Sequence, residues 1–439
     1  MDRREFTGKM AAFLGALGTT ITMPSHPSKP RQPARPRVNG ERLQRHLSEL
    51  AEFGKNPYGG VSRLAYSDSD RAGRDYVMRL MREAKLDVTI DYGGNIVGRR
   101  AGSVSGLPPV VAGSHIDSVP DGGNYDGTVG VLAAIEVAQT LAEAGMVTRH
   151  PLEVVIFQNE EGGTVGSRAM IGDLHDRDLD SIARSGKSWR DGIRFLGGAP
   201  ERLDRPLRQR GDVAAYVELH IEQGGTLERE GIQIGIVEGI VGIGWWDVSV
   251  EGFANHAGTT PMNDRRDALL AAARFVEAVN RVAKSEPGRH VATVGRIQAF
   301  PGAPNVIPGR VQASLEIRDL DSAKIARLFE RVRQEADRIA AATGTTFRFE
   351  NSYLSKPALM DRAVQSTIER AATELGLSSK YLPSGAGHDA QHMAQIAPAG
   401  MIFVPSVGGI SHSPKEYTHP ADVVNGANVL LQAVIALAG

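Results

Sequence analysis

The sequence predicts an α/β protein: an open mixed sheet flanked by helices, with a smaller ferredoxin-like β-α-β-β-α-β module inserted in the chain. Two observations predict this class. The first is a strand, helix, strand pattern with continuously apolar strands between residues 108 and 161, which is typical of parallel crossover units. The second is a change of pattern after about Trp245, where strands and helices follow the order of a split βαβ module.

Composition limits the class of protein before any motif is considered. The 439 residues suggest two or three domains at about 150 residues each. The net charge of −1 gives no electrostatic attraction for a polyanion, so nucleic acid is not expected as a partner. The chain contains 0 Cys, which excludes disulfides, thiolate zinc sites and cysteine nucleophiles. Any metal must therefore be bound by His, Asp or Glu.

The N-terminal residues 1–37 differ from the rest of the chain and are excluded from the predicted fold. They begin with Arg3 and Arg4, continue through a weakly apolar Gly/Ala-rich stretch at 10–23, and end in regularly spaced prolines. A twin arginine before a short apolar stretch is similar to the signals that export folded proteins across a bacterial inner membrane. The alternative is a basic tail without a signal function. We expect a periplasmic or exported protein without a stable membrane anchor, and otherwise a cytoplasmic one.

Two amphipathic helices are predicted to open the folded part of the chain. Asn39 can cap the first, in which Leu43, Leu47 and Leu50 fall on one face. The second is entered through the polar run at 67–70 and has apolar residues at the same spacing. Both are expected to pack against the sheet.

Three predicted strands bring polar residues to one edge of the first sheet. The strand at 108–115 ends in His115, and the strand at 152–161 ends in Glu160 and Glu161. A third apolar run, at 213–224, contains His220. Because ligands bind at the carboxyl ends of strands in open α/β sheets, this edge is the predicted site.

The inserted module is predicted at 244–351, between the two parts of the main domain, 38–243 and 352–439. Its predicted elements are strand 245–251, helix 266–283, strand 291–299, strand 310–318, helix 321–342 and strand 345–350.

Several residues near the predicted edge could carry chemistry. A lone buried His or a loop Asp is usually structural, but here several of them meet at one edge. Imidazoles and carboxylates suit divalent cations, and a carboxylate between two cations can bridge them. The candidates are His115, Asp117, Asp126, Glu160, Glu161, His220, His256 and His412.

With these motifs, the chain resembles the M20-type metallohydrolases. Within them it is similar to the hydantoinase/carbamoylase branch of N-carbamoyl-L-amino acid hydrolases, ureidopropionases and allantoate amidohydrolases. The resemblance covers roughly residues 38–439. It rests on GSHIDSV (113–119), GGNYDGTVG (122–130), NEEG (159–162), LHIEQG (219–224), NHAGTTPM (255–262), GAPNVIPG (302–309), EIRD (316–319), GAGHDA (385–390) and GGISHSPKE (408–416).

This resemblance implies two divalent metal ions per subunit, zinc or else manganese, cobalt or nickel. His115, Asp126 and His220 would hold one ion; Asp126, Glu161 and His412 would hold the other, with Asp126 as the bridge. Asp117 would orient His115. Glu160 would act as general base on a water activated by the metals and then return the proton to the leaving nitrogen.

The resemblance also implies how a small ureido or N-carbamoyl amino acid is bound. Arg318 would clamp its carboxylate, with Asn305 beside it. His256 would polarise the scissile carbonyl, and Gln223 and His388 would contact the ureido group. The family is commonly dimeric through the inserted domain, so the resemblance implies that the module at 244–351 acts as a lid and dimerisation domain. We therefore expect a homodimer whose site is assembled by hinge closure.

One departure concerns the substrate pocket. After Glu161 the chain continues as GGTVGSRAM, a few residues shorter than is common in this branch, which predicts an altered pocket wall and leaves substrate identity open. Other motifs are excluded: Gly186-Lys187-Ser188 lacks the upstream glycine of a phosphate-binding loop, and neither GxSxG nor HExxH occurs.

Three hypotheses about function follow. The first is an amidohydrolase that cleaves the carbamoyl C–N bond of N-carbamoyl-L-amino acids or a related ureido acid. The second is an allantoate amidohydrolase, dipeptidase or deacylase on the same scaffold. The third, from a different class, is an exported ureido-acid binding protein without hydrolysis. The presence of both Glu160 and Arg318 argues against the third hypothesis, because a protein that only binds its ligand has no need of a free base.

Overall fold

The structure is a computed structural model that describes residues 35–439. Residues 37–439 form one compact unit. Of the predicted leader at 1–37, only the last three residues are described, so the export signal lies outside the described residues and stays a prediction.

The first sheet has nine strands within the described chain, in the order β1-β2-β4-β3-β5-β16-β6-β14, with β15 paired to β6. Strands β4, β3, β5 and β16 run parallel to one another. Strand β2 pairs with β4, and β6 pairs with β16, in antiparallel fashion. The predicted open mixed sheet is therefore confirmed. Its strands are β1 (Asp87–Ile90), β2 (Ile96–Arg100), β3 (Val110–His115), β4 (Leu152–Phe157), β5 (Ala215–Ile221), β6 (Ile234–Ile240), β14 (Ala358–Leu359), β15 (Ser379–Ser384) and β16 (Ala399–Val404).

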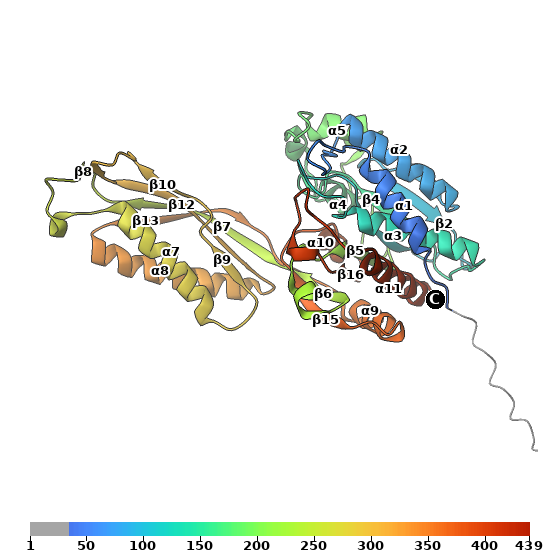
Figure 1. The fold of residues 1–439 in the computed structure, drawn as a ribbon. Helices are drawn as coiled ribbons and strands as arrows, with labels where there is room; N and C mark the ends of the chain where they lie inside the picture. Colours follow the sequence, from blue (N-terminus) through green and yellow to red (C-terminus); the bar gives the residue numbers. More distant parts are fainter. Residues whose placement is uncertain (1–34) are drawn as a thin grey trace, which may run out of the picture. The chain divides into compact units, whose positions relative to one another are not determined.

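Helices cover both faces of this sheet (Figure 1). On β4, Val154 and Ile156 face the core beneath α1, α2, α3, α9 and α11, whereas Val155 and Phe157 face the core beneath α4 and α10. Continuously apolar strands are thus explained by burial on both faces. The helices of this part are α1 (Gly40–Ala51), α2 (Asp68–Glu83), α3 (Thr128–Glu143), α4 (Val165–Ile171), α5 (Trp189–Phe195), α6 (Thr226–Glu230), α9 (Arg362–Glu374), α10 (Ala390–Ile396) and α11 (Pro420–Ala438).

The predicted helix starts agree with the structure because their capping residues are used. The Asn39 side chain accepts a hydrogen bond from the Arg42 N–H at 3.0 Å, and α1 buries Leu43, Leu47 and Leu50. Ser67 caps α2 in the same way. Such caps satisfy N–H groups that have no partner within the helix.

Helix α11 has the length and apolar composition of a membrane span. However, 61% of its most apolar stretch of 18 residues is buried inside the protein. It contacts α3 and α9, and its apolar residues belong to the main core. Its composition is therefore accounted for by its place in the core of the described unit.

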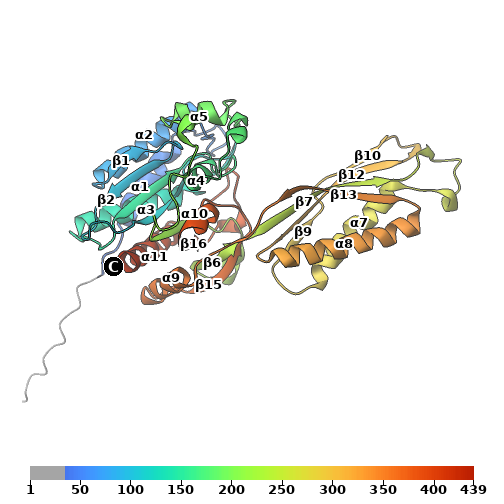
Figure 2. The same cartoon turned by 180° about the vertical axis from the view of Figure 1, so that it is seen from behind.

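The second sheet has five strands, in the order β10-β12-β7-β13 with β9 also paired to β12, and every pair is antiparallel. Helices α7 and α8 cover one of its faces (Figure 2). This confirms the predicted β-α-β-β-α-β order, while the division of the chain into domains stays a prediction. The elements are β7 (Gly242–Glu251), α7 (Ala268–Ser285), β9 (Val291–Thr293), β10 (Ile297–Phe300), β12 (Arg310–Asp319), α8 (Ser322–Thr343) and β13 (Thr346–Leu354).

One predicted element of the second sheet is wrong in detail. The single strand expected at 291–299 is two strands, β9 and β10, that pair with opposite ends of β12. Between β9 and β10 the regular pairing with β12 is interrupted, and the Ser314 N–H donates to the Arg296 carbonyl at 3.1 Å. A two-residue pairing, β8 (Asn255–His256) with β11 (Val306–Ile307), was also not predicted, because strands this short have no periodicity.

Phe275 should carry much of the stability of the second sheet. It is 0% exposed on α7, and its ring lies 5.5 Å from that of Phe347 and 5.9 Å from that of Phe349. We expect Phe275→Ala to lower the free energy of unfolding by about 3–5 kcal/mol, measured by urea denaturation with tryptophan fluorescence. The control is Phe253→Ala, whose side chain is 56% exposed and should cost under about 0.5 kcal/mol. Equal costs for the two variants would contradict this packing.

Candidate functional site

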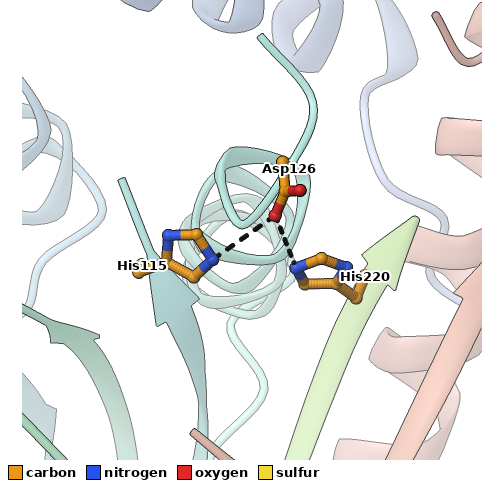
Figure 3. A group of neighbouring side chains, drawn as sticks. All are labelled: His115, Asp126 and His220. Carbon is orange, nitrogen blue, oxygen red and sulfur yellow. Dashed lines mark ion pairs between the residues drawn. The ribbon is translucent and has the colours of Figure 1, made fainter. Parts of the chain in front are cut away.

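The site is built at the carboxyl ends of three adjacent parallel strands. His115 is the last residue of β3, His220 lies near the end of β5, and Glu160 follows the end of β4. The loop after β3 returns across this edge and brings Asp126 to the start of α3. Figure 3 shows the Asp126 carboxylate lying between the two imidazoles. Its Oδ1 is 3.5 Å from His115 Nε2 and 3.1 Å from His220 Nε2.

A second group of donors shares Asp126. His412, on the loop between β16 and α11, has its Nε2 3.3 Å from Asp126 Oδ2 and 3.5 Å from Glu161 Oε1. Within each of two groups, one donor atom per residue lies within 4.8 Å of the others, and Asp126 belongs to both. The groups are His115, Asp126 and His220, and Asp126, Glu161 and His412.

The imidazoles are oriented so that Nε2 faces the carboxylates. His115 Nδ1 lies 3.0 Å from the Asp117 carbonyl oxygen, and His220 Nδ1 lies 2.9 Å from that of Ile221. A carbonyl can only accept, so each Nδ1 carries a proton, and each Nε2, once deprotonated, can offer its lone pair to a cation. Consistent with this, the Gly127 N–H donates to His220 Nε2 at 3.1 Å.

These donors fit a divalent cation. His115 Nε2 and Glu161 Oε1 are buried and have no hydrogen-bond partner in the described chain. Buried polar atoms without partners are costly, and here they converge with carboxylate oxygens and further imidazoles. Borderline and hard divalent cations bind this mixture of nitrogen and oxygen donors.

The charge on Asp126 is stabilised by its neighbours. Burial raises the pKa of Asp126, but the His220, His115 and His412 imidazoles outweigh burial and hold it well below its usual range. The same contacts act on the partner: the hydrogen bond to Asp126 raises the pKa of His412 to about 8. Asp126 is thus an anionic centre surrounded by three imidazoles.

Glu160 lies beside the first group without belonging to it. Its Oε2 is 3.7 Å from His115 Nε2, and its side chain is only 9% exposed. Burial raises the pKa of Glu160 well above the usual carboxyl range, although His115 opposes the shift. A carboxylate that holds a proton this readily has the properties of a general base.

Asp117 lies differently from the expected arrangement. Its carboxylate is 3.8 Å from His115 Nδ1, and it is the backbone carbonyl that contacts the ring. The carboxylate instead accepts hydrogen bonds from the Glu160 and Glu161 N–H groups, each at 3.2 Å. Asp117 therefore joins the loop after β3 to the loop after β4, because its two oxygens can accept two neighbouring N–H donors.

Two of the predicted substrate-binding residues lie at this edge. Gln223 Nε2 donates to Asp126 Oδ2 at 2.6 Å, while its Oε1 is buried without a partner. His388 is buried, with its ring 4.4 Å from that of His220 and one nitrogen 2.9 Å from Ser384 Oγ.

The other three lie on or next to the second sheet and its short β8–β11 pairing, and none belongs to the donor groups found among residues 35–439. His256 is exposed on β8, where its Nδ1 accepts from the Gly258 N–H at 3.0 Å. The Asn305 carbonyl accepts from the Ala257 N–H. Arg318 is paired with Glu316, Nη2 to Oε2 at 2.9 Å.

Glu218 is a buried residue of the site that was not predicted. It forms a third donor group with His220 and His388. Its carboxylate already accepts hydrogen bonds from Ser114 Oγ, the Tyr216 hydroxyl and the Ala390 N–H. Because these three hydrogen bonds already occupy its carboxylate, Glu218 is better suited to holding its neighbours in place than to binding a metal ion. Its position two residues before His220 on β5, and so on the same face, was the available signal.

An α/β fold with a His/carboxylate centre at the strand ends defines a class of candidate metal-dependent hydrolases, and comparison with known proteins identifies the family. Residues 111–436 match Peptidase family M20/M25/M40. The chain belongs to this family and is an M20 hydrolase, so the non-enzymatic alternative is not retained.

Named relatives align along nearly the whole chain. An N-carbamoyl-L-amino acid amidohydrolase of Geobacillus stearothermophilus is 43% identical, over 91% of this chain and 99% of that protein. A ureidoglycolate hydrolase of Oryza sativa is 40% identical, over 91% and 85%. The crystal structure of a hydantoinase/carbamoylase family amidase from Burkholderia multivorans is similar with a TM-score of 0.86 and 42% identity, over 92% and 98%.

Proposed function

We propose that this protein is an amidohydrolase that cleaves the carbamoyl C–N bond of N-carbamoyl-L-amino acids or a closely related ureido acid. The observation that carries the proposal is the pair of donor groups sharing Asp126, with the buried Glu160 beside them, in a chain whose named relatives act on carbamoyl and ureido compounds. We further propose a homodimer formed through the second sheet.

Two divalent ions, zinc or else manganese, cobalt or nickel, are proposed as cofactors. His115, Asp126 and His220 would hold one; Asp126, Glu161 and His412 would hold the other. When bound, the ions would supply Lewis acidity, which polarises a carbonyl and lowers the pKa of water.

In the proposed reaction Glu160 moves the proton. Its carboxylate takes a proton from the attacking water, the water oxygen forms a bond to the ureido carbonyl carbon, and the bond from that carbon to the amino-acid nitrogen breaks, which leaves carbamic acid. Glu160 then gives the proton to the departing nitrogen, which leaves as the amino group of the amino acid. Asp117 fixes the Glu160 backbone during both transfers through its 3.2 Å hydrogen bond.

The substrate would be oriented by five polar side chains. The planar guanidinium of Arg318 suits the amino-acid carboxylate, with Asn305 beside it, because two parallel N–H groups match two oxygens. Gln223 and His388 would contact the ureido group, and His256 would stabilise the oxyanion. In this proposal the substrate carboxylate replaces Glu316 as the partner of Arg318.

A substrate panel tests this function. The full chain, supplied separately with zinc, manganese, cobalt or nickel, is assayed on N-carbamoyl-L-amino acids, ureidoglycolate, allantoate, N-acyl amino acids and dipeptides. We expect the highest kcat/KM on an N-carbamoyl-L-amino acid, with the free amino acid, ammonia and carbon dioxide as products. A clear preference for allantoate would favour the second hypothesis, and cleavage of dipeptides alone would contradict the proposal.

A further inference from the structure

Two ligand-bearing loops meet at one buried carboxylate that has no role in the proposed reaction. The first loop runs from β3 to α3 and carries Asp126; the second runs from β16 to α11 and carries His412. Glu416 belongs to the second loop, four residues after His412, and its side chain, which is 5% exposed, contacts the first loop.

Glu416 contacts both loops directly. Its Oε1 accepts hydrogen bonds from the backbone N–H groups of Tyr125 at 2.9 Å and Asp126 at 3.0 Å. Its Oε2 lies 2.8 Å from Ser411 Oγ, and the same hydroxyl lies 2.9 Å from Asp126 Oδ2. One carboxylate therefore contacts both the backbone of Asp126 and Ser411, and Ser411 is the residue that precedes His412.

The first loop is shaped to admit this carboxylate. A Cβ added at Gly123 would lie 2.2 Å from Glu416 Oε1 and 2.3 Å from its Cβ. Only a residue without a side chain permits this approach. On the second loop His412 has a φ of 54°, a left-handed conformation that is unfavourable for a non-glycine residue and persists only when surrounding contacts enforce it.

We propose that Glu416 is a positioning residue that sets the spacing between Asp126 and His412, and so holds the second donor group ready for a metal ion. This inference rests on the metal sites of the proposed function. It adds that Asp126 and His412 of the second group are brought together from two loops by Glu416, whereas His115 and His220 of the first group are placed by adjacent strands.

Metal binding by the full chain tests the proposal without a substrate. Metal-stripped protein is titrated calorimetrically with Mn²⁺ and with Co²⁺. We expect Glu416→Ala to weaken binding of at least one equivalent about 10–100-fold, as is usual for groups that hold metal ligands. Glu416→Gln should rescue binding to within about 3-fold of wild type. Its amide oxygen can still accept from the two N–H groups, and its NH₂ can donate to Ser411.

The matched control is Glu136→Ala. Glu136 is 2% exposed on α3 and also accepts from a backbone N–H, that of Asn39 at 2.8 Å, but it pairs with Arg42 away from the donor groups. We expect its metal affinity to equal that of wild type even where its stability falls as far as that of Glu416→Ala. Hydrogen exchange at Tyr125 and Asp126 should speed up in Glu416→Ala only.

Gly123→Ala provides a second route if Glu416→Ala fails to fold, because its added methyl should displace Glu416 and give the same loss of metal affinity. Unchanged metal affinity in Glu416→Ala, or in Gly123→Ala, would overturn the proposal, as would equal losses in Glu136→Ala. A wild-type protein that binds metal but does not hydrolyse ureido acids would refute the proposed function and leave this inference standing. A wild-type protein that binds no divalent metal would refute both.

Discussion

Glu160→Gln should lower kcat by about 10²–10⁴-fold while leaving the metal content unchanged. The amide has the size of the carboxylate but cannot take a proton from water. The hydrogen bond from Glu160 to the Asp117 carboxylate uses the Glu160 N–H and not the Glu160 side chain, so the loop after β4 should keep its position. Because Glu160 is not a member of either donor group, its charge is not needed to hold a cation.

The measurement is steady-state hydrolysis of the best substrate, with metal content determined by mass spectrometry on the same preparation. KM should change little, since Glu160 is assigned to proton transfer and not to binding of the substrate carboxylate. Activity within about 10-fold of wild type would reject Glu160 as the base. A parallel loss of metal would instead make it a ligand.

Asp126→Asn should have an effect at least as large, by a different route. Asp126 is the one residue common to both donor groups, and its two oxygens face different imidazoles. An amide has one oxygen and no negative charge, so it cannot serve both groups. We expect the metal content to fall from two ions to one or fewer per chain and turnover to fall by about 10³-fold or more, since several kcal/mol of charge stabilisation are lost.

The same loop supplies a matched control for this substitution. Asp121 lies five residues earlier, is exposed, and accepts from Asn56 Nδ2 at 2.9 Å outside the donor groups. Its φ of 52° is tolerated by asparagine, so Asp121→Asn removes a charge without backbone strain. Metal content and activity should stay near wild type in this variant. Equal metal content in Asp126→Asn and wild type would refute Asp126 as a shared ligand.

Much of this fold could be predicted because local signals agreed with the tertiary structure. The capping residues Asn39 and Ser67 start α1 and α2, and apolar runs of strand length become buried parallel strands. Once β3, β4 and β5 are parallel neighbours, His115, Glu160 and His220 must lie at one edge. The order of elements likewise fixed the topology of the second sheet.

What could not be predicted depends on contacts between distant segments. The break between β9 and β10 arises from pairing with β12, which the apolar pattern does not encode. The Asp117 carboxylate binds two N–H groups more than forty positions away, and Glu416 binds N–H groups 290 and 291 positions away. Such hydrogen bonds use backbone N–H donors that every residue except proline possesses, so the sequence carries no mark of them.

Arg318 illustrates the same limit. The family resemblance implied that the Arg318 guanidinium binds a substrate carboxylate. In the structure its Nε and Nη2 donate to Glu316, two residues earlier on the same face of β12, and its Nη1 donates to the Gly385 carbonyl. An i, i+2 pair on one strand is visible in the sequence, but its competition with a substrate is not.

The central claim is that two cations share Asp126, and anomalous diffraction tests it most directly. Crystals of the full chain grown with Mn²⁺ or Zn²⁺ should give two anomalous peaks about 3.5–4 Å apart, one on each side of the Asp126 carboxylate. The first should lie among the nitrogens of His115 and His220, and the second between Glu161 and His412. A single peak, or two peaks that do not share Asp126, would contradict the account.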